Sequence, residues 1–144
     1  MRMSRRILIA LVSLCLAVGL QAQFARTLHS SIEVGEAGEI LIDIAGDVVV
    51  EPWAGNTVLV ETQVKMYNAS KGIFVYYVET AGRYDVVHEL SGSRLRVYSM
   101  DGQRKPIQSK RGLSTEEVRT RVFIPSNFAG KGSGPYAMVT NDGR

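Results

Sequence analysis

Short runs in which apolar and polar residues alternate, separated by turn residues, dominate the chain between residues 27 and 125. Ile40, Ile42 and Ile44 show the pattern most clearly, because they occupy every second position. This period of two is typical of a strand with one buried face, since successive side chains of a strand point to opposite sides. No long segment has a convincing helical period. The sequence therefore predicts an all-β domain.

The spacing of these runs narrows the architecture. About seven or eight strands, with turns every 8 to 12 residues or so, favour a two-sheet sandwich or a short β-solenoid-like module, and a barrel also fits. The run from Ile73 to Val78 is apolar on both faces, so we expect a strand between two layers. The residues that we expect to be buried lie on the apolar faces of the alternating runs: Ile42, Ile44, Val58, Val60, Val86, Val97, Val122 and Ile124.

The N-terminus has the three parts of a secretory signal. Three arginines within the first six residues precede the uncharged run Ile7–Leu20, and Ala22 offers a small residue before Gln23. The apolar run is shorter than the roughly 20 residues that span a bilayer, which favours a cleaved signal over a retained anchor. The predicted organisation is a signal peptide over 1–22, a β domain over 23–125, and a Gly-rich tail or the start of a truncated repeat region over 126–144.

The charge balance changes when the signal is removed. The whole chain has 17 Lys plus Arg and 14 Asp plus Glu, but three of the basic residues lie within residues 1–22. The 122 residues that remain of 144 would carry 14 charges of each sign. Nucleic-acid binding needs a retained basic surface, so we expect no nucleic-acid partner. Cys15, the single cysteine, lies in the signal, which excludes disulfides and thiolate metal sites from the exported domain.

One stretch resembles a known family. From Ile42 to Trp53, a strand leads into a Gly46-Asp47 step, three valines, an acidic residue and the tryptophan. This arrangement resembles the start of a family of bacterial secreted proteins labelled adhesin-like, an all-β domain of unknown function. The resemblance implies an all-β module followed by short strands stacked as a β-helix, and Val118–Pro125 resembles the strand-then-proline step before those repeats. It covers the N-terminal part of the family only, and it names no ligand and no catalytic residue.

The sequence contains little that suggests catalysis. His29 and His88 are the only histidines, and His88 shares a strand face with Val86 and Leu90, which predicts a histidine at the edge of the core rather than a metal ligand. Nucleophile and phosphate-binding motifs are absent from the sequence. We therefore expect a protein that is not an enzyme and that uses no metal and no cofactor. One alternative is a glycosidase pair drawn from the carboxylates Asp43, Asp47, Glu51 and Glu61, against the simpler interpretation of a solvated acidic face.

Two features suggest an interaction surface. Trp53 follows a proline at a turn, where its ring either caps the core or stacks on a sugar. The polar connection over 101–117 gathers positive charge, which fits either a solvated loop or a docking patch for an acidic partner. The basic residues of this connection are Arg104, Lys105, Lys110 and Arg111.

The function that these features favour is a non-catalytic, exported β module in cell-envelope or surface attachment. It would act in the periplasm, on the outer surface or in the medium, with an envelope protein or a surface glycan as partner and with no membrane span after processing. The first alternative is a periplasmic ligand- or partner-binding domain of an envelope-sensing system. The second alternative is a secreted, carboxylate-dependent glycosidase.

Overall fold

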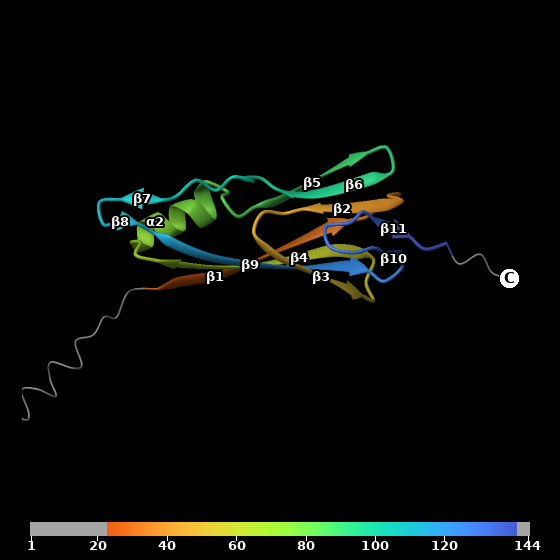
Figure 1. Ribbon diagram of the computed structural model, residues 1–144, viewed down its shortest axis with the longest axis horizontal. Coiled ribbons are helices and arrows are strands. Elements are labelled where there is room, and N and C mark those ends of the chain that lie inside the picture. The colour runs from red at the N-terminus through yellow and green to blue at the C-terminus, as the bar shows by residue number, and fades with distance from the viewer. Residues whose placement is uncertain (1–22, 141–144) are drawn as a thin grey trace, which may run out of the picture.

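A computed structural model describes residues 23–140, so the predicted signal peptide and its cleavage site lie outside the described residues. In the described part, two sheets pack face to face and neither closes into a barrel (Figure 1). The predicted all-β class is confirmed, and the architecture is that of a sandwich. Between residues 23 and 140, no helix is long and apolar enough to cross a membrane.

The first sheet has four strands in the order β1-β4-β9-β3. Pairing is antiparallel between β1 and β4 and between β4 and β9, whereas β3 runs parallel to β9. The strands are β1 (Phe24–Glu33), β3 (Asp47–Trp53), β4 (Thr57–Tyr67) and β9 (Thr115–Pro125). In this order β1 and β3 form the two edges.

The second sheet has five strands in the order β10-β11-β2-β6-β5, and a separate hairpin joins β7 to β8. These strands are β2 (Glu39–Asp43), β5 (Val86–Ser91), β6 (Arg94–Ser99), β7 (Gln108–Ser109), β8 (Gly112–Leu113), β10 (Phe128–Ala129) and β11 (Tyr136–Met138). Strands of two or three residues, such as β7, β8, β10 and β11, are too short to show an alternating pattern. They raise the number of strands above the predicted seven or eight.

The main core lies between the two sheets, where the alternating residues meet. The predicted core residues Ile42, Val58, Val60, Val97, Val122 and Ile124 are each at most 3% exposed. Ile44 and Val86 are only partly buried, but both pack against this cluster. The period of two therefore located most of the main core correctly.

The predicted strand over Ile73–Val78 is wrong. The segment forms α2 (Lys71–Val75), which continues as the π-helix η1 (Tyr76–Thr80). The Ser70 hydroxyl accepts a hydrogen bond from the Ile73 amide at 3.2 Å, which caps the first turn. Phe74 and Val78 are one turn apart and both are buried, because a helix places residues i and i+4 on one face.

The helix covers a second group of buried residues, which we call the capped cluster. Its members come from β4, from the helix and from the connections around it: Val64, Met66, Ala69, Phe74, Val78, Tyr84 and Ile107. Strands of the four-stranded sheet form one wall, and the helix with the flanking connections forms the other (Figure 1). The helix therefore takes the place that strands of the second sheet occupy over the main core.

Strand β5 also differs from prediction. His88 is exposed and Leu90 is 56% exposed, although both were expected on the core side. The reason is that β5 is the outermost strand of its sheet, and Val86 is the residue of this strand that packs on the main core. Ala81 and Gly82 follow the helix, and Gly82 adopts a φ of 62°.

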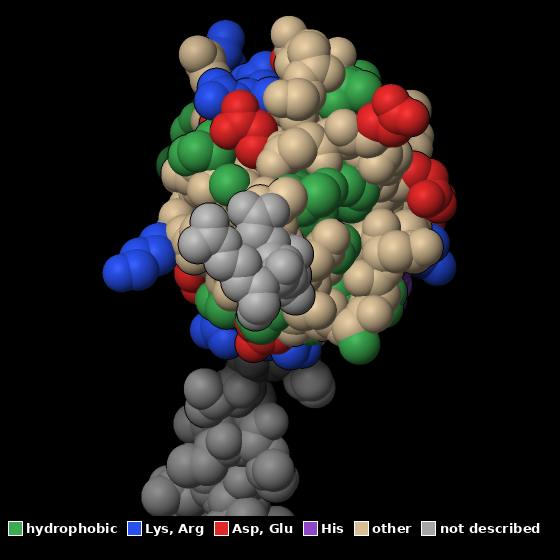
Figure 2. All heavy atoms as spheres, turned by 90° about the vertical axis from the view of Figure 1, so that its right-hand side faces the viewer, with side chains coloured by type: hydrophobic (Ala, Val, Ile, Leu, Met, Phe, Trp, Pro, Cys, Tyr) green, Lys and Arg blue, Asp and Glu red, His purple; other side chains and the backbone are tan. Residues whose placement is uncertain are grey.

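The segment beyond Pro125 contributes to the fold as far as Met138. Phe128 and Tyr136 belong to the main core, and β11 pairs with β2 in an antiparallel arrangement. At this end of the molecule hydrophobic side chains show on the surface among scattered charges (Figure 2). Met138 and Val139, which end this segment, are 42% and 51% exposed.

Candidate functional site

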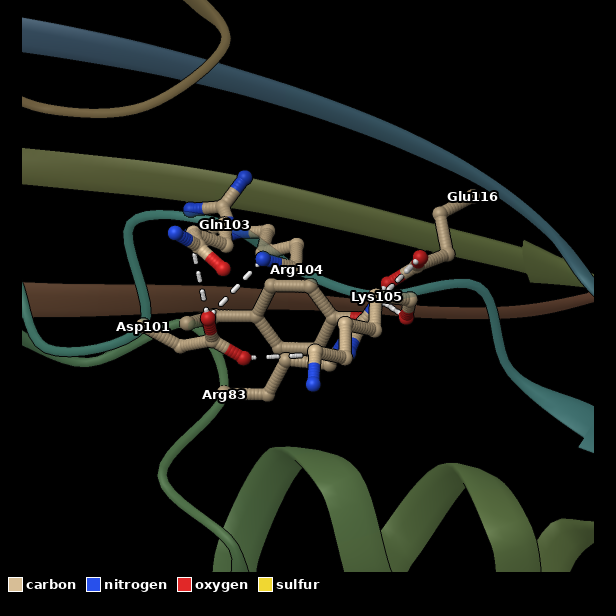
Figure 3. A network of polar contacts seen from close by, with 7 residues as sticks. Arg83, Asp101, Gln103, Arg104, Lys105 and Glu116 are labelled. Carbon is tan, nitrogen blue, oxygen red and sulfur yellow. Dashed lines mark hydrogen bonds and ion pairs between the residues drawn. The ribbon is translucent and has the colours of Figure 1, made fainter.

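A buried ion pair ties the connections around the helix to β9 (Figure 3). Arg83 is 5% exposed, and its Nε and Nη2 donate to the two carboxylate oxygens of Glu116 at 2.8 and 2.7 Å. Nη2 also donates to the backbone carbonyl of Lys105 at 2.7 Å. A two-point contact between a guanidinium and a carboxylate fixes the orientation of both groups. Arg83 thus fastens the connection after the helix and the connection before β7 to the same strand.

Tyr84 and Arg104 complete this polar network. The Tyr84 hydroxyl donates to Glu116, and the Arg104 guanidinium lies 5.3 Å from the centre of the Tyr84 ring. Asp101 accepts hydrogen bonds from the amides of Gln103 and Arg104 at 3.1 and 2.8 Å, which holds the turn that enters this connection. The Nε of Arg104 is buried without a hydrogen-bond partner among the described residues.

The pKa values follow from these contacts. Burial alone would raise the pKa of Glu116, but hydrogen bonds from Arg83 and Tyr84 outweigh burial and lower it. Burial raises the pKa of Tyr84, and its hydrogen bond to Glu116 adds to this effect. The hydrogen bond to Glu116 raises the pKa of Arg83, while burial lowers the pKa of Arg104. Glu116 is therefore held ionised between groups that stabilise its charge.

The residues of the predicted interaction surface do not come together. Arg104 is folded into the polar network, whereas Lys105, Lys110 and Arg111 are exposed, the last two at the turn between β7 and β8. Trp53 ends β3, at the other end of the sandwich (Figure 1), and its Nε1 donates to the Thr57 carbonyl at 2.8 Å. The tryptophan thus closes the turn between β3 and β4, far from the basic residues.

The four candidate carboxylates are spread over both sheets. Asp43 on β2 pairs with Arg96 at 2.5 Å, and Glu51 on β3 pairs with Arg121 at 2.9 Å. Asp47 and Glu61 line one hollow of about 350 Å³ on the outer face of the four-stranded sheet. Strand β9 lies between them and brings Arg119 and Arg121 into the same hollow. This face therefore carries carboxylates and arginines on neighbouring strands.

A groove follows the free edge of β3. It consists of two adjoining hollows of about 370 and 250 Å³, which share Val50 and Gly132. We call this feature the β3 groove. Its lining comes from β2, β3 and the connection between them, from the end of β9, and from β10, β11 and the segment that joins them: Ile42, Ile44, Gly46, Val48, Val50, Glu51, Pro52, Ile124, Phe128, Ala129, Gly130, Lys131, Gly132, Ser133 and Tyr136.

The groove exists because β3 has a neighbour on one side only. Val48 and Val50 point toward the main core, yet both stay partly exposed. Across the groove, the Ser133 carbonyl accepts from the Ile42 amide at 2.8 Å, and the Tyr136 hydroxyl donates to the Gly132 carbonyl at 2.6 Å. These bonds hold the opposite wall against β2 and leave the space beside β3 open. Sequence reasoning missed the groove, although Pro52 in an otherwise regular strand indicated an edge.

Comparison with known proteins gives no further assignment: no family model, no curated protein and no solved structure matches this chain. Within residues 23–140, no group of three or more metal-ligating side chains converges. The β3 groove is the candidate site that the described geometry supports best.

Proposed function

We propose that this protein is a non-catalytic, exported β module that attaches to an envelope protein through the β3 groove. The observation that carries this proposal is the groove itself, because a channel with both apolar and polar lining beside a strand edge is a surface that a partner can cover. The arginines and signal-like run at the N-terminus support export. The resemblance of Ile42–Trp53 to the adhesin-like family agrees with attachment.

The charges of the domain also favour a binding role. On the outer faces of both sheets, carboxylates pair with arginines of neighbouring strands, as in the pairs Asp43–Arg96 and Glu51–Arg121. A carboxyl group that acts as a general acid at neutral pH needs a desolvated site that raises its pKa. Glu116, the carboxylate most enclosed by the fold, has its pKa lowered instead. Attachment requires no such carboxylate, and the channel along the edge of β3 supplies apolar and polar groups for binding.

In-cell photo-cross-linking tests this proposal. A photoreactive side chain replaces Lys131, which is exposed and lines the groove, and as a matched control it replaces Lys110, which is exposed at the β7–β8 turn. We expect a discrete adduct with an envelope protein from position 131 and none from position 110. An absence of adducts from position 131 in exported protein, or equal adducts from both positions, would contradict attachment through the groove.

A further inference from the structure

We propose that the β3 groove binds an extended segment of its partner as an added strand, with apolar residues at alternate positions and a basic residue on its outward side. This inference rests on the proposed function and specifies the chemistry of the partner at the same site. The added segment would become the fifth strand of the sheet β1-β4-β9-β3. It would pair with the backbone of β3 and place side chains in the groove.

The backbone of β3 presents hydrogen-bonding groups to a partner at two positions, Val48 and Val50. The Ser126 amide donates to the Trp53 carbonyl at 2.9 Å, so Trp53 directs its backbone toward the β9 side. Backbone groups alternate in direction along a strand that pairs on one side. Asp47, Val49 and Glu51 therefore also bond to β9, whereas Val48 and Val50 direct their N–H and C=O groups away from it.

Pro52 supports this assignment. Pro52 lies two residues after Val50, so its backbone points the same way as that of Val48 and Val50. Its nitrogen therefore faces the free edge, where the missing N–H costs no hydrogen bond to β9. The proline also limits the free edge. Beyond Val50 an added strand finds one backbone donor fewer, so the pairing surface centres on Val48 and Val50.

The side-chain pattern of the occupant follows from the two hollows. The smaller hollow is lined by Val48 and Ile44, the larger by Pro52 and Phe128, and Val50 lies between them. Inward residues of an added strand are two positions apart, about 6.6 Å along the strand. Two apolar side chains in alternate positions would therefore enter successive parts of the groove. Another hollow, of about 320 Å³, includes residues of the edge strand β1, but it lies on the outer face of the sheet, over His29, Leu59 and Phe123, and not between the two sheets.

The charges on the outer face of β3 predict which side chain the added strand carries on its own outer face. Asp47 and Glu51 flank the exposed Val49 on the outer face of β3. Glu51 pairs with Arg121, but Asp47 has no ion pair within residues 23–140. A basic side chain of the added strand opposite Asp47 would supply that partner.

The same charges argue against a second copy of this chain as the occupant. In the longest antiparallel overlap of two β3 strands that leaves out Pro52, which is centred on Val49, Asp47 of one copy lies opposite Glu51 of the other. Like charges directly opposite each other destabilise a sheet, and this register brings them together twice. Shifted registers shorten the overlap or use Pro52, which lacks an N–H.

The test uses the isotope-labelled full chain and a short capped peptide in which valine and lysine alternate. Backbone amide NMR follows binding, and hydrogen exchange follows the amides of Val48 and Val50. We expect saturable binding that slows exchange at these two amides by at least about tenfold and leaves the β5 amides unchanged. A peptide with glutamate in place of lysine should bind at least about tenfold more weakly.

The matched controls are two peptides that are N-methylated at alternate residues, one on the valines and the other on the lysines. One set of amides faces β3 and the other faces away, so one methylated peptide should lose binding at least about tenfold and the other should retain it. These controls leave the protein unchanged. Retention of binding by both methylated peptides, or protection of β1 or β5 instead of β3, would overturn the added-strand inference.

The protein variant Val50→Pro gives an independent check, because it removes an outward N–H as Pro52 already does. We expect it to keep its NMR spectrum outside β3 and to bind the peptide at least about tenfold more weakly. Concentration-dependent self-association that slows exchange at Val48 and Val50 would identify a second copy as the occupant and refute the peptide proposal. If cross-linking from position 131 succeeds while all peptides fail, attachment stands and strand addition is wrong.

Discussion

The capped cluster and the β3 groove both border the four-stranded sheet, but the first is covered by other parts of the chain and the second is open. Over the capped cluster, α2 and η1 cover the sheet, and Arg83 and Glu116 fasten the connections that hold the helix in place. Along β3, no strand within residues 23–140 pairs with the free edge, and Val48 and Val50 stay partly exposed. One region is closed by buried polar contacts and the other is left open at a strand edge.

This difference has a physical reason. Closing the capped cluster required burial of a guanidinium and a carboxylate, which is costly unless both are paired and hydrogen-bonded. The three hydrogen bonds from Arg83 to Glu116 and to Lys105 satisfy that condition. An open edge has the opposite properties, because its free backbone groups are solvated and it gains stability only when a partner strand arrives. We therefore expect substitutions to affect stability at the capped cluster and binding at the groove.

The largest expected effect comes from Glu116→Ala. The change leaves the Arg83 guanidinium, 5% exposed, without its carboxylate, and it removes the acceptor of the Tyr84 hydroxyl. We expect a loss of about 3 to 5 kcal/mol in the free energy of unfolding, measured by denaturant titration.

The neighbouring variant Glu117→Ala is the matched control. Glu117 is 37% exposed and pairs with the more exposed Arg119 at 3.0 Å. Its removal should cost at most about 1 kcal/mol. Equal losses for the two variants would contradict the view that Arg83 and Glu116 close the capped cluster.

Val97→Thr tests the closed core against the open edge. Val97 is fully buried, so the new hydroxyl has no water and should cost about 1 to 3 kcal/mol. Val49→Thr introduces the same hydroxyl on the outer face of β3, where the side chain is 50% exposed, and should change stability by no more than about 0.5 kcal/mol. Thermal unfolding of the two variants side by side measures the difference, and a cost at Val49 as large as at Val97 would place β3 inside a covered interface.

Ser70→Ala removes the cap of the helix that covers the capped cluster. The Ser70 hydroxyl satisfies the Ile73 amide at 3.2 Å, and loss of a serine cap typically costs about 1 kcal/mol. Denaturant titration should show this loss, with Ser70→Asp as the control that keeps an acceptor and restores stability. If alanine and aspartate behave alike, the cap does not stabilise the helix.

The pH dependence of stability tests the polar network around Glu116 through a smaller expected effect. The pKa of Glu116 is lower in the folded protein than in the unfolded chain, so its contribution is complete at neutral pH. As the pH falls below about 4.3, the unfolded chain takes up the proton first, and the contribution is lost progressively until the folded pKa is passed. The stability difference between the native chain and Glu116→Gln should therefore shrink as the pH falls, and a constant difference would contradict the assignment.

The sequence predicted the main core well but did not predict the capped cluster. Ile42 and Val97 lie in alternating runs, whose period of two specifies the buried face directly. Phe74 and Val78 lie in a run with apolar residues at almost every position, where strand and helix cannot be separated by period alone. The signals that were missed are Ser70 as a cap and the spacing of four between these two residues.

The candidate site was not predicted, because Trp53 and the basic residues of 101–117, which were expected to form the interaction surface, do not line the β3 groove. The one signal in the sequence is Pro52, which indicates a strand edge. The groove beside it, however, is built from β2, β3 and the segment after β10, which are far apart along the chain. Gly132 and Val50 meet through tertiary packing, and no spacing in the sequence encodes that contact.

The central claim is that the outer edge of β3 is open and presents the backbone of Val48 and Val50. Residue-resolved hydrogen exchange of the chain without a partner tests this claim most directly. We predict an alternation along the strand, with fast exchange at Val48 and Val50 and slow exchange at Val49 and Glu51, which bond to β9. Uniform protection of all four amides, or the opposite alternation, would show that the edge is covered or faces the other way.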